Sequence, residues 1–287
     1  MTKTAAVTAH YSIGDILGRI ESGLTKIGSN VERVTVDELS LVDEFHIGGR
    51  AATEHFFPQL GFEEGQRILD IGCGIGGGAR FAAAKYGVEV EGVDLTDSYI
   101  ETGKVLNEWV GLEDKVLLQT GDATSLNFAN ESFDAAFTMH VCMNIENTRF
   151  VFEEAYRVVK PGGVFGSYDV TKYSDVACAF PLPWATEEAP SFLAKSSEYV
   201  DSLESVGVTI DIINDRPRPE VNETNYVPRV KIPTLMLNGR YDSFFPYDTA
   251  IKPMFDLLGT PEEDKVLKIY ETDHIPPKNE FVKEILA

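Results

Sequence analysis

Apolar residues recur along this chain with two different spacings. Short runs in which Val, Ile and Leu alternate with polar residues predict strands, and stretches with apolar residues three and four apart predict helices. Strands are expected at residues 67–71, 88–94, 115–119, 133–139 and 164–170, and helices at residues 79–86, 98–110 and 148–159 between them. This alternation predicts an α/β fold, in which a parallel sheet carries helices on both faces.

Helices are also predicted ahead of the first strand. They are expected at residues 11–26, from about residue 37, and at residues 50–60. Thr35 and Glu38 have the spacing of a capping box, which marks the start of the second of these helices. The pair Gly48-Gly49 separates the first two helices from the third. The N-terminal helices either cover one edge of the sheet or form a lid over a bound ligand, hinged at the two glycines.

The first strand runs directly into a glycine-rich segment, residues 72–78. Glycines let the backbone turn sharply and approach a ligand with no side chain in the way. The start of the next helix presents free N–H groups and a positive dipole end at the same point. Gly72, Gly74 and Gly77 also satisfy the G-x-G-x-x-G fingerprint of dinucleotide enzymes, so the loop alone does not identify the ligand.

Acidic residues at the ends of three successive predicted strands narrow the choice. Asp70 can accept from an ammonium group, and Asp122 can accept from the exocyclic amine of an adenine. Asp94 lies about twenty residues past the loop, the position that binds ribose hydroxyls. A ligand with an ammonium, a ribose and an adenine but no pyrophosphate fits all three, and S-adenosylmethionine is such a ligand. Asp70 and Asp122 speak against the alternative, a nicotinamide-dependent oxidoreductase.

Three motifs carry a resemblance to a known family: Asp70-Ile71-Gly72-Cys73-Gly74-Ile75-Gly76-Gly77, Phe133-Asp134-Ala135-Ala136-Phe137 and Arg157-Val158-Val159-Lys160-Pro161-Gly162-Gly163. With them, residues 1–216 resemble the class I S-adenosylmethionine-dependent methyltransferases. Residues 43–53, 140–145 and 180–185 resemble the small-molecule branch that includes sarcosine and dimethylglycine methyltransferases. The resemblance implies a Rossmann-like, doubly wound and mostly parallel sheet, and it favours the lid interpretation of the N-terminal helices.

The resemblance also implies the site. Cofactor contacts are expected from the glycine loop, the strand ends and the lid hinge, namely Asp70, Gly72, Cys73, Gly74, Gly76, Asp94, Leu95, Asp122, Ala123, Met139, His46, Gly48 and Gly49. His140 follows the fourth strand, beside the expected position of the transferable methyl group. It is either a catalytic residue or a rim residue whose backbone alone touches the cofactor. No metal is expected.

Composition limits the partners and the location. The formal net charge of −21 disfavours nucleic-acid substrates, because such a surface repels phosphates. Three widely spaced cysteines favour a reducing cytoplasm over disulfides or a zinc site. No apolar run approaches the ~20 residues of a membrane helix, and the N-terminus lacks the apolar core of a signal peptide. A small-molecule substrate is therefore expected, with no membrane partner, and a homodimer is compatible with the sequence.

The last part of the chain departs from the family pattern. A helix at residues 196–205 and a strand at residues 208–213 should complete the methyltransferase domain, and a proline-rich segment then suggests a linker. Residues 217–287 resemble an α/β-hydrolase fragment, with Asp242 and His274 at the positions of a triad acid and histidine. The chain has no G-x-S-x-G nucleophile motif, so we expect no hydrolysis. The tail is expected to supply the seventh strand of the sheet, in this chain or in a second copy, or else the sheet is left one strand short.

The leading interpretation is methyl transfer from S-adenosylmethionine to a nitrogen, oxygen or carbon of a small molecule. A rival of another class is a non-catalytic protein that keeps the cofactor pocket for stability or sensing.

Overall fold

The computed structural model describes residues 15–26, 28–44, 46–172, 184–185, 191–214, 234–239 and 265–270. The chain divides into two compact units, Met1–Asp211 and Ile212–Ala287, close to the boundary predicted at residue 216. The hydrolase-like character of the second unit stays a prediction, because Asp242 and His274 lie outside the described residues.

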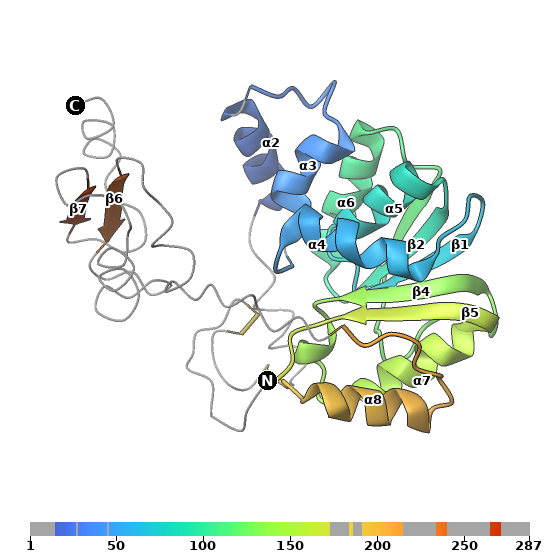
Figure 1. The fold of residues 1–287 in the computed structure, drawn as a ribbon. Coiled ribbons are helices and arrows are strands. Elements are labelled where there is room, and N and C mark those ends of the chain that lie inside the picture. The colour runs from blue at the N-terminus through green and yellow to red at the C-terminus, as the bar shows by residue number, and fades with distance from the viewer. Residues whose placement is uncertain are drawn as a thin grey trace. The chain divides into compact units, whose positions relative to one another are not determined.

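A five-stranded parallel sheet forms the centre of the first unit, in the order β3-β2-β1-β4-β5 (Figure 1). The strands are β1 (Arg67–Ile71), β2 (Glu89–Asp94), β3 (Val116–Thr120), β4 (Phe133–Met139) and β5 (Val159–Tyr168). From β1 the chain winds outward to β2 and β3, and then returns to place β4 on the other side of β1. Ligands of such sheets bind at the carboxyl ends of the strands, beside this reversal. The predicted doubly wound α/β fold is confirmed.

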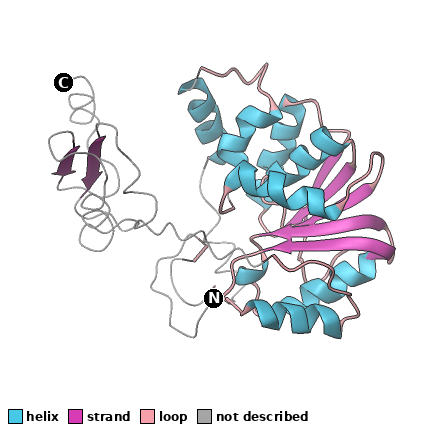
Figure 2. Ribbon diagram, in the orientation of Figure 1, coloured by secondary structure: helices cyan, strands magenta, loops and turns pink. Residues whose placement is uncertain are grey.

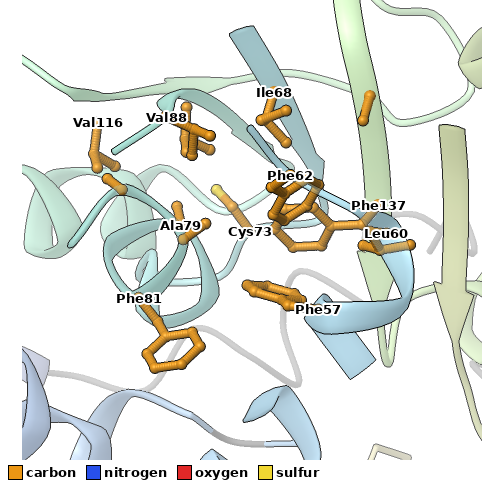
Figure 3. Packing of buried hydrophobic residues seen from close by; sticks show 14 of the residues in the cluster. Phe57, Leu60, Phe62, Ile68, Cys73, Ala79, Phe81, Val88, Val116 and Phe137 are labelled. Atoms are coloured by element: carbon orange, nitrogen blue, oxygen red, sulfur yellow. The ribbon is translucent and has the colours of Figure 1, made fainter. Parts of the chain in front are cut away.

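Helices cover both faces of the sheet (Figure 2). One face carries α4 (Gly49–Phe56), η1 (Phe57–Leu60), α5 (Gly77–Tyr86) and α6 (Asp97–Trp109), with α2 (Ile16–Lys26) and α3 (Val36–Asp43) nearby, and the other carries α7 (Thr148–Val158) and α8 (Ser196–Ser205). The rings of Phe57, Phe62 and Phe137 gather in the core of the first face, with Phe57 and Phe137 centred 4.8 Å apart (Figure 3). This packing fixes the helices that surround the glycine loop.

The N-terminal helices follow the sequence signals closely. The capping box is confirmed: the backbone N–H of Glu38 donates to the Thr35 hydroxyl, and Oε2 of Glu38 accepts from the Thr35 N–H. The helix predicted at residues 50–60 is α4 followed by the short helix η1, with Pro58 at the change between them. Only residues 16–26 of the first predicted helix are described as helical.

Two strand predictions need correction. β5 begins at Val159 rather than Val164, because Val159 already pairs with Phe133 and the segment 160–163 bulges outward before the ladder resumes at Val164. The predicted strand at residues 208–213 is absent, although the structure describes those residues. Its alternating apolar pattern finds no neighbouring strand in the described part of the chain, and a strand without a ladder partner is not stable.

The second unit contains a small parallel sheet of its own. β6 (Thr234–Gly239) pairs with β7 (Lys265–Tyr270) along its whole length. In the described residues neither strand joins the five-stranded sheet, and the expectation that the tail supplies its missing strand stays a prediction. The backbone groups of β6 that face β7 are already paired within that small sheet.

Candidate functional site

The glycine loop and Asp94 hold each other at the carboxyl ends of β1 and β2. Oδ2 of Asp94 accepts from the backbone N–H of Gly74, and Oδ1 accepts from that of Thr96, both at 2.9 Å. Burial raises the pKa of Asp94. Gly74 has φ 55°, and a Cβ there would meet no protein atom within 4 Å. By contrast, a Cβ at Gly72 would collide with the side chain of Val141. The loop therefore leaves open space at Gly74, beside the Asp94 carboxylate.

Asp70 lies in β1, just before this loop begins. It is only 3% exposed, and its carboxylate accepts the backbone N–H of Ala79 in the first turn of α5. Burial first, and then the nearby charge of Asp94, raise its pKa well above the ordinary value. Cys73 and Gly76 belong to the same loop, where the Gly76 N–H donates to the Cys73 carbonyl at 2.8 Å. Asp70 therefore links the end of β1 to the first turn of α5, and it does not face solvent.

The third predicted acid stands at the end of β3. Asp122 is exposed, and its Oδ1 accepts from the backbone N–H and the hydroxyl of Thr124, at 2.8 and 2.7 Å. The preceding N–H, that of Gly121, donates to the Asp94 carbonyl at 2.9 Å and brings the two strand ends together. Leu95 and Ala123 follow the two acids and are half-buried. The structure thus gathers the ends of β1, β2 and β3 at one edge of the sheet.

The hinge glycines of the N-terminal segment lie beside a buried polar cluster. Gly48 and Gly49 have φ values of 88° and 46°, which suit glycine. Nε2 of His46 lies 3.0 Å from the Gly49 carbonyl and 3.0 Å from the Thr53 hydroxyl, and Thr53 in turn donates to Glu44 at 2.6 Å. Burial lowers the pKa of His46. This network fixes the ring of His46 toward α4.

A buried ion pair connects the end of α3 to α5. Nη2 of Arg80 donates to Oδ2 of Asp43 at 2.8 Å, and Nη1 donates to Oδ1 of Asn107 at 2.8 Å. Both side chains of the pair are at most 1% exposed. The other oxygen of Asp43 has no hydrogen-bond partner in the described structure, and the Asp43 carbonyl lies against Gly77. The end of α3 is therefore anchored on the first turn of the helix that follows the glycine loop.

His140 stands at the end of β4 in a strained backbone conformation, with φ 57°. Its N–H donates to the Tyr168 carbonyl at 2.8 Å, and its ring stacks on the Tyr168 ring with centroids 5.5 Å apart. The His46 ring lies 6.0 Å away, edge-on. Burial, and then the neighbouring His46, lower the pKa of His140 to about 4. Met139, just before it, is half-buried and packs against the core. His140 is thus a neutral imidazole at physiological pH.

The predicted residues therefore form two groups at one edge of the sheet. The loop glycines and the three acids lie at the ends of β1, β2 and β3, and His46, His140 and Met139 lie near the ends of β4 and β5. Sequence reasoning missed Tyr168 and Asp169, which end β5 and contact the His140 segment. The same rule that selected the other acids, an acid at the carboxyl end of a parallel strand, would have selected Asp169.

Comparison with known proteins adds the family. Residues 69–166 match the model of the family described as "Methyltransferase domain". The chain is 30% identical over 233 residues to a sterol 24-C-methyltransferase of Yarrowia lipolytica, across 75% of this chain and 61% of the relative. Residues 69–166 thus form a methyltransferase domain, and the sheet has the Rossmann-like fold of the class I methyltransferases. It spans less than two thirds of the length of the first curated relatives that it matches.

Other relatives agree with this domain assignment. The methyltransferase GfsG of Streptomyces halstedii is 28% identical over 224 residues, which cover 76% of this chain and 79% of GfsG. A solved structure of phosphoethanolamine N-methyltransferase 2 of Haemonchus contortus, in complex with S-adenosyl-L-methionine, superposes with a TM-score of 0.54 at 25% identity, covering 71% of this chain and 48% of that one. Across the described part of the chain, no helix of the methyltransferase domain or beyond has the length and apolar character that spanning a membrane requires.

Proposed function

We propose that this protein is an enzyme that transfers a methyl group from S-adenosylmethionine to a small-molecule acceptor. The observation that carries the proposal is the gathering of the glycine loop, Asp94, Asp122 and His140 at one edge of a methyltransferase-family sheet. Bound there, the cofactor supplies an electrophilic methyl group on its sulfonium. The chain then contributes mainly proximity and alignment, which can be worth roughly 7–11 kcal/mol.

The residues present suit this cofactor. The open space at Gly74 admits a ligand against the loop backbone, and the half-buried Asp94 carboxylate lies beside that space as an acceptor for ribose hydroxyls. The exposed carboxylate of Asp122 is free to approach an adenine amine through Oδ2. Asp70 would act on the ammonium end of the cofactor indirectly, by fixing the first turn of α5 directly after the loop. His46, Gly48 and Gly49 would close the site from the lid.

His140 would orient the acceptor. It would not act as a general base that takes a proton from the acceptor. A general base works best with a pKa near the working pH, and the pKa of His140 is lowered to about 4. A neutral imidazole can still accept a hydrogen bond from an N–H or O–H of the acceptor and direct its lone pair. This role suits an acceptor that needs little acid–base help, such as a neutral amine or an enolate.

The test is mass spectrometry of the small molecules that the protein methylates in a cell extract supplied with isotope-labelled S-adenosylmethionine. New labelled products that disappear with Asp94→Ala would support the proposal. The non-catalytic alternative predicts tight binding of S-adenosylhomocysteine without labelled product. A nicotinamide-dependent oxidoreductase, which the relatives do not favour, would be stabilised by NAD rather than S-adenosylhomocysteine in a thermal-shift comparison.

The net charge and the cysteines of the chain support the proposed substrate class and cellular location. The net charge of −21 supports a small-molecule substrate over a nucleic acid. Cys73 and Cys142 are free and buried, in keeping with a reducing cytoplasm. A homodimer, to be tested by light scattering, stays part of the proposal. We also keep the division into a methyltransferase domain, residues 1–216, and a hydrolase-like fragment without hydrolase activity, residues 217–287.

A further inference from the structure

Asp169, the residue directly after β5, receives hydrogen bonds from four donors. Its Oδ1 accepts from the backbone N–H of Cys142 at 3.1 Å, and its Oδ2 accepts from the Ser167 hydroxyl at 3.1 Å. The backbone N–H of Met143 and the thiol of Cys142 also donate to this carboxyl group. Four donors from two segments thus converge on one side chain that binds no predicted ligand.

Three of those donors lie in the turn that follows His140, and the fourth, the Ser167 hydroxyl, lies in β5. The short helix η2 (Cys142–Asn144) begins two residues after His140, and its first N–H groups are the ones that Asp169 receives. His140 itself has φ 57°, a conformation that a non-glycine side chain keeps only where its surroundings hold it. Tyr168 holds the other side, through its carbonyl and its ring. Two consecutive residues at the end of β5 therefore fix the His140 segment from both directions.

We propose that Asp169 is a positioning residue, whose ionised carboxylate fixes the turn Cys142–Asn144 and thereby the orientation of the His140 imidazole. The inference rests on the proposed function, in which His140 orients the acceptor. A carboxylate has about four acceptor positions and no donor, which matches the four donors present. A protonated Asp169 would carry a hydrogen of its own into this cluster and would lose at least one of the four bonds. The turn is then held less firmly.

The groups around Asp169 separate its titration from that of His140. Burial raises the pKa of Asp169 to about 6, against the hydrogen bonds of Cys142 and Ser167 that lower it. The titratable groups that face it are the Cys142 thiol from η2 and the Tyr199 hydroxyl from α8, and burial raises the pKa of both. Both stay neutral between pH 5 and 8, while His140 titrates near pH 4. Above about pH 6 the turn is held, and below it the turn loosens.

The experiment is a pH titration of the full-length protein, followed by NMR of its ¹³C-labelled histidine rings, with the His140 signal assigned by loss in His140→Gln. We expect the His140 signal to shift near pH 6, in addition to its own titration near pH 4. Asp169→Asn should abolish the shift near pH 6. The matched control is Asp134→Asn, which makes the same change on β4 at the opposite end of the sheet, where Asp134 pairs with Lys160, and it should keep the shift.

Ser167→Ala keeps the test decisive if Asp169→Asn does not fold. Removing one donor to the ionised form should move the shift upward in pH. A His140 signal without a shift near pH 6, or one unchanged in both variants, overturns the proposal. A labelled-methyl assay adds a second measurement: Asp169→Asn should lower turnover by ~10- to 100-fold with little change in S-adenosylhomocysteine affinity. If the parent makes no methylated product, the proposed function fails, while the NMR result still decides the role of Asp169.

Discussion

On the side of β1 and β2, a single carboxylate holds the site together. Asp94 accepts hydrogen bonds from the backbone N–H groups of Gly74 and Thr96, which lie twenty and two residues away in the sequence. On the side of β4 and β5, the site is held by side chains from distant segments. His140 stacks on Tyr168, and Tyr168 donates to the Ile47 carbonyl of the lid at 3.1 Å. The first side is built from one β-α-β unit, whereas the second depends on tertiary packing across more than a hundred residues.

The difference has a functional consequence under the proposed function. The cofactor is the same throughout such a family, so a fixed backbone cradle suffices for it. The acceptor differs between relatives, and side chains on a rigid strand end can be exchanged without disturbing the cradle. Variants that affect the two sides should therefore separate cofactor affinity from turnover.

The largest effect is expected from the ion pair that joins the lid to the cofactor side. Arg80→Met leaves Asp43 buried without a partner, which typically destabilises a protein by ~3–5 kcal/mol. Urea unfolding followed by circular dichroism measures this. Adding Asp43→Asn to the same variant should recover part of the loss. Arg149→Met is the control, since Arg149 pairs with Glu153 at the surface and should matter by less than ~1 kcal/mol. Equal losses of stability in Arg80→Met and Arg149→Met would contradict an anchoring role for the Arg80–Asp43 ion pair.

Asp94→Ala should affect cofactor affinity most strongly. It removes the acceptor of the Gly74 N–H as well as the expected ribose contact, and charge-assisted bonds are worth ~1.5–3 kcal/mol. Affinity for S-adenosylhomocysteine, measured by calorimetry, should fall by about 10- to 100-fold. Asp97→Ala, an exposed acid in the first turn of α6, is the matched control and should bind nearly as the parent does. Unchanged affinity in Asp94→Ala would contradict the cofactor assignment.

These two sides also differ in how far the sequence predicted them. The strands, the glycine loop and Asp94 followed from local patterns, because a strand, a tight turn and the next helix lie close together in the chain. Tyr168 did not, because its contacts with His140 depend on the pairing of β4 with β5, whereas Asp169 follows a strand end and the same local rule would have selected it. The early start of β5 was missed for the same reason: Val159 is extended only because Phe133 pairs with it.

The acceptor side should respond in turnover rather than in cofactor affinity. Tyr168→Leu removes the ring that stacks on His140 and the hydroxyl that reaches Ile47. Misplacement of an orienting group by about 1 Å can cost up to ~100-fold, so we expect turnover to fall by roughly tenfold or more with affinity for S-adenosylhomocysteine within twofold. Tyr156→Leu, at an exposed tyrosine of α7, serves as the control. A loss confined to cofactor affinity would show that Tyr168 belongs to the other side.

A smaller change is expected from Asp122→Asn. The amide keeps the shape of the side chain but places a donor where an adenine amine needs an acceptor. Because Asp122 is exposed, water competes for the contact, and the loss should be only a few-fold, about 1 kcal/mol or less. The sharper measurement is discrimination against a cofactor analogue that lacks the amine, which should decrease in the variant. Equal discrimination in variant and parent would contradict the adenine contact.

The smallest free-energy change is expected in the lid. It tests whether a ligand bound on the cofactor side affects a segment that also contacts the acceptor side. Residues 43–50 contact the acceptor side through Ile47 and the cofactor side through the ion pair of Asp43 with Arg80, and the hinge glycines allow movement between them. Binding of S-adenosylhomocysteine should therefore slow hydrogen exchange in this segment by several-fold. Exchange in β1, which is buried with or without a ligand, should not change. The helix α2 should respond less than the hinge, because Ile20 and Leu24 are packed in the same core cluster as Ile75 and Leu106. Equal exchange at residues 43–50 with and without ligand would mean that the helices are a fixed cover, and that the cofactor side is complete without them.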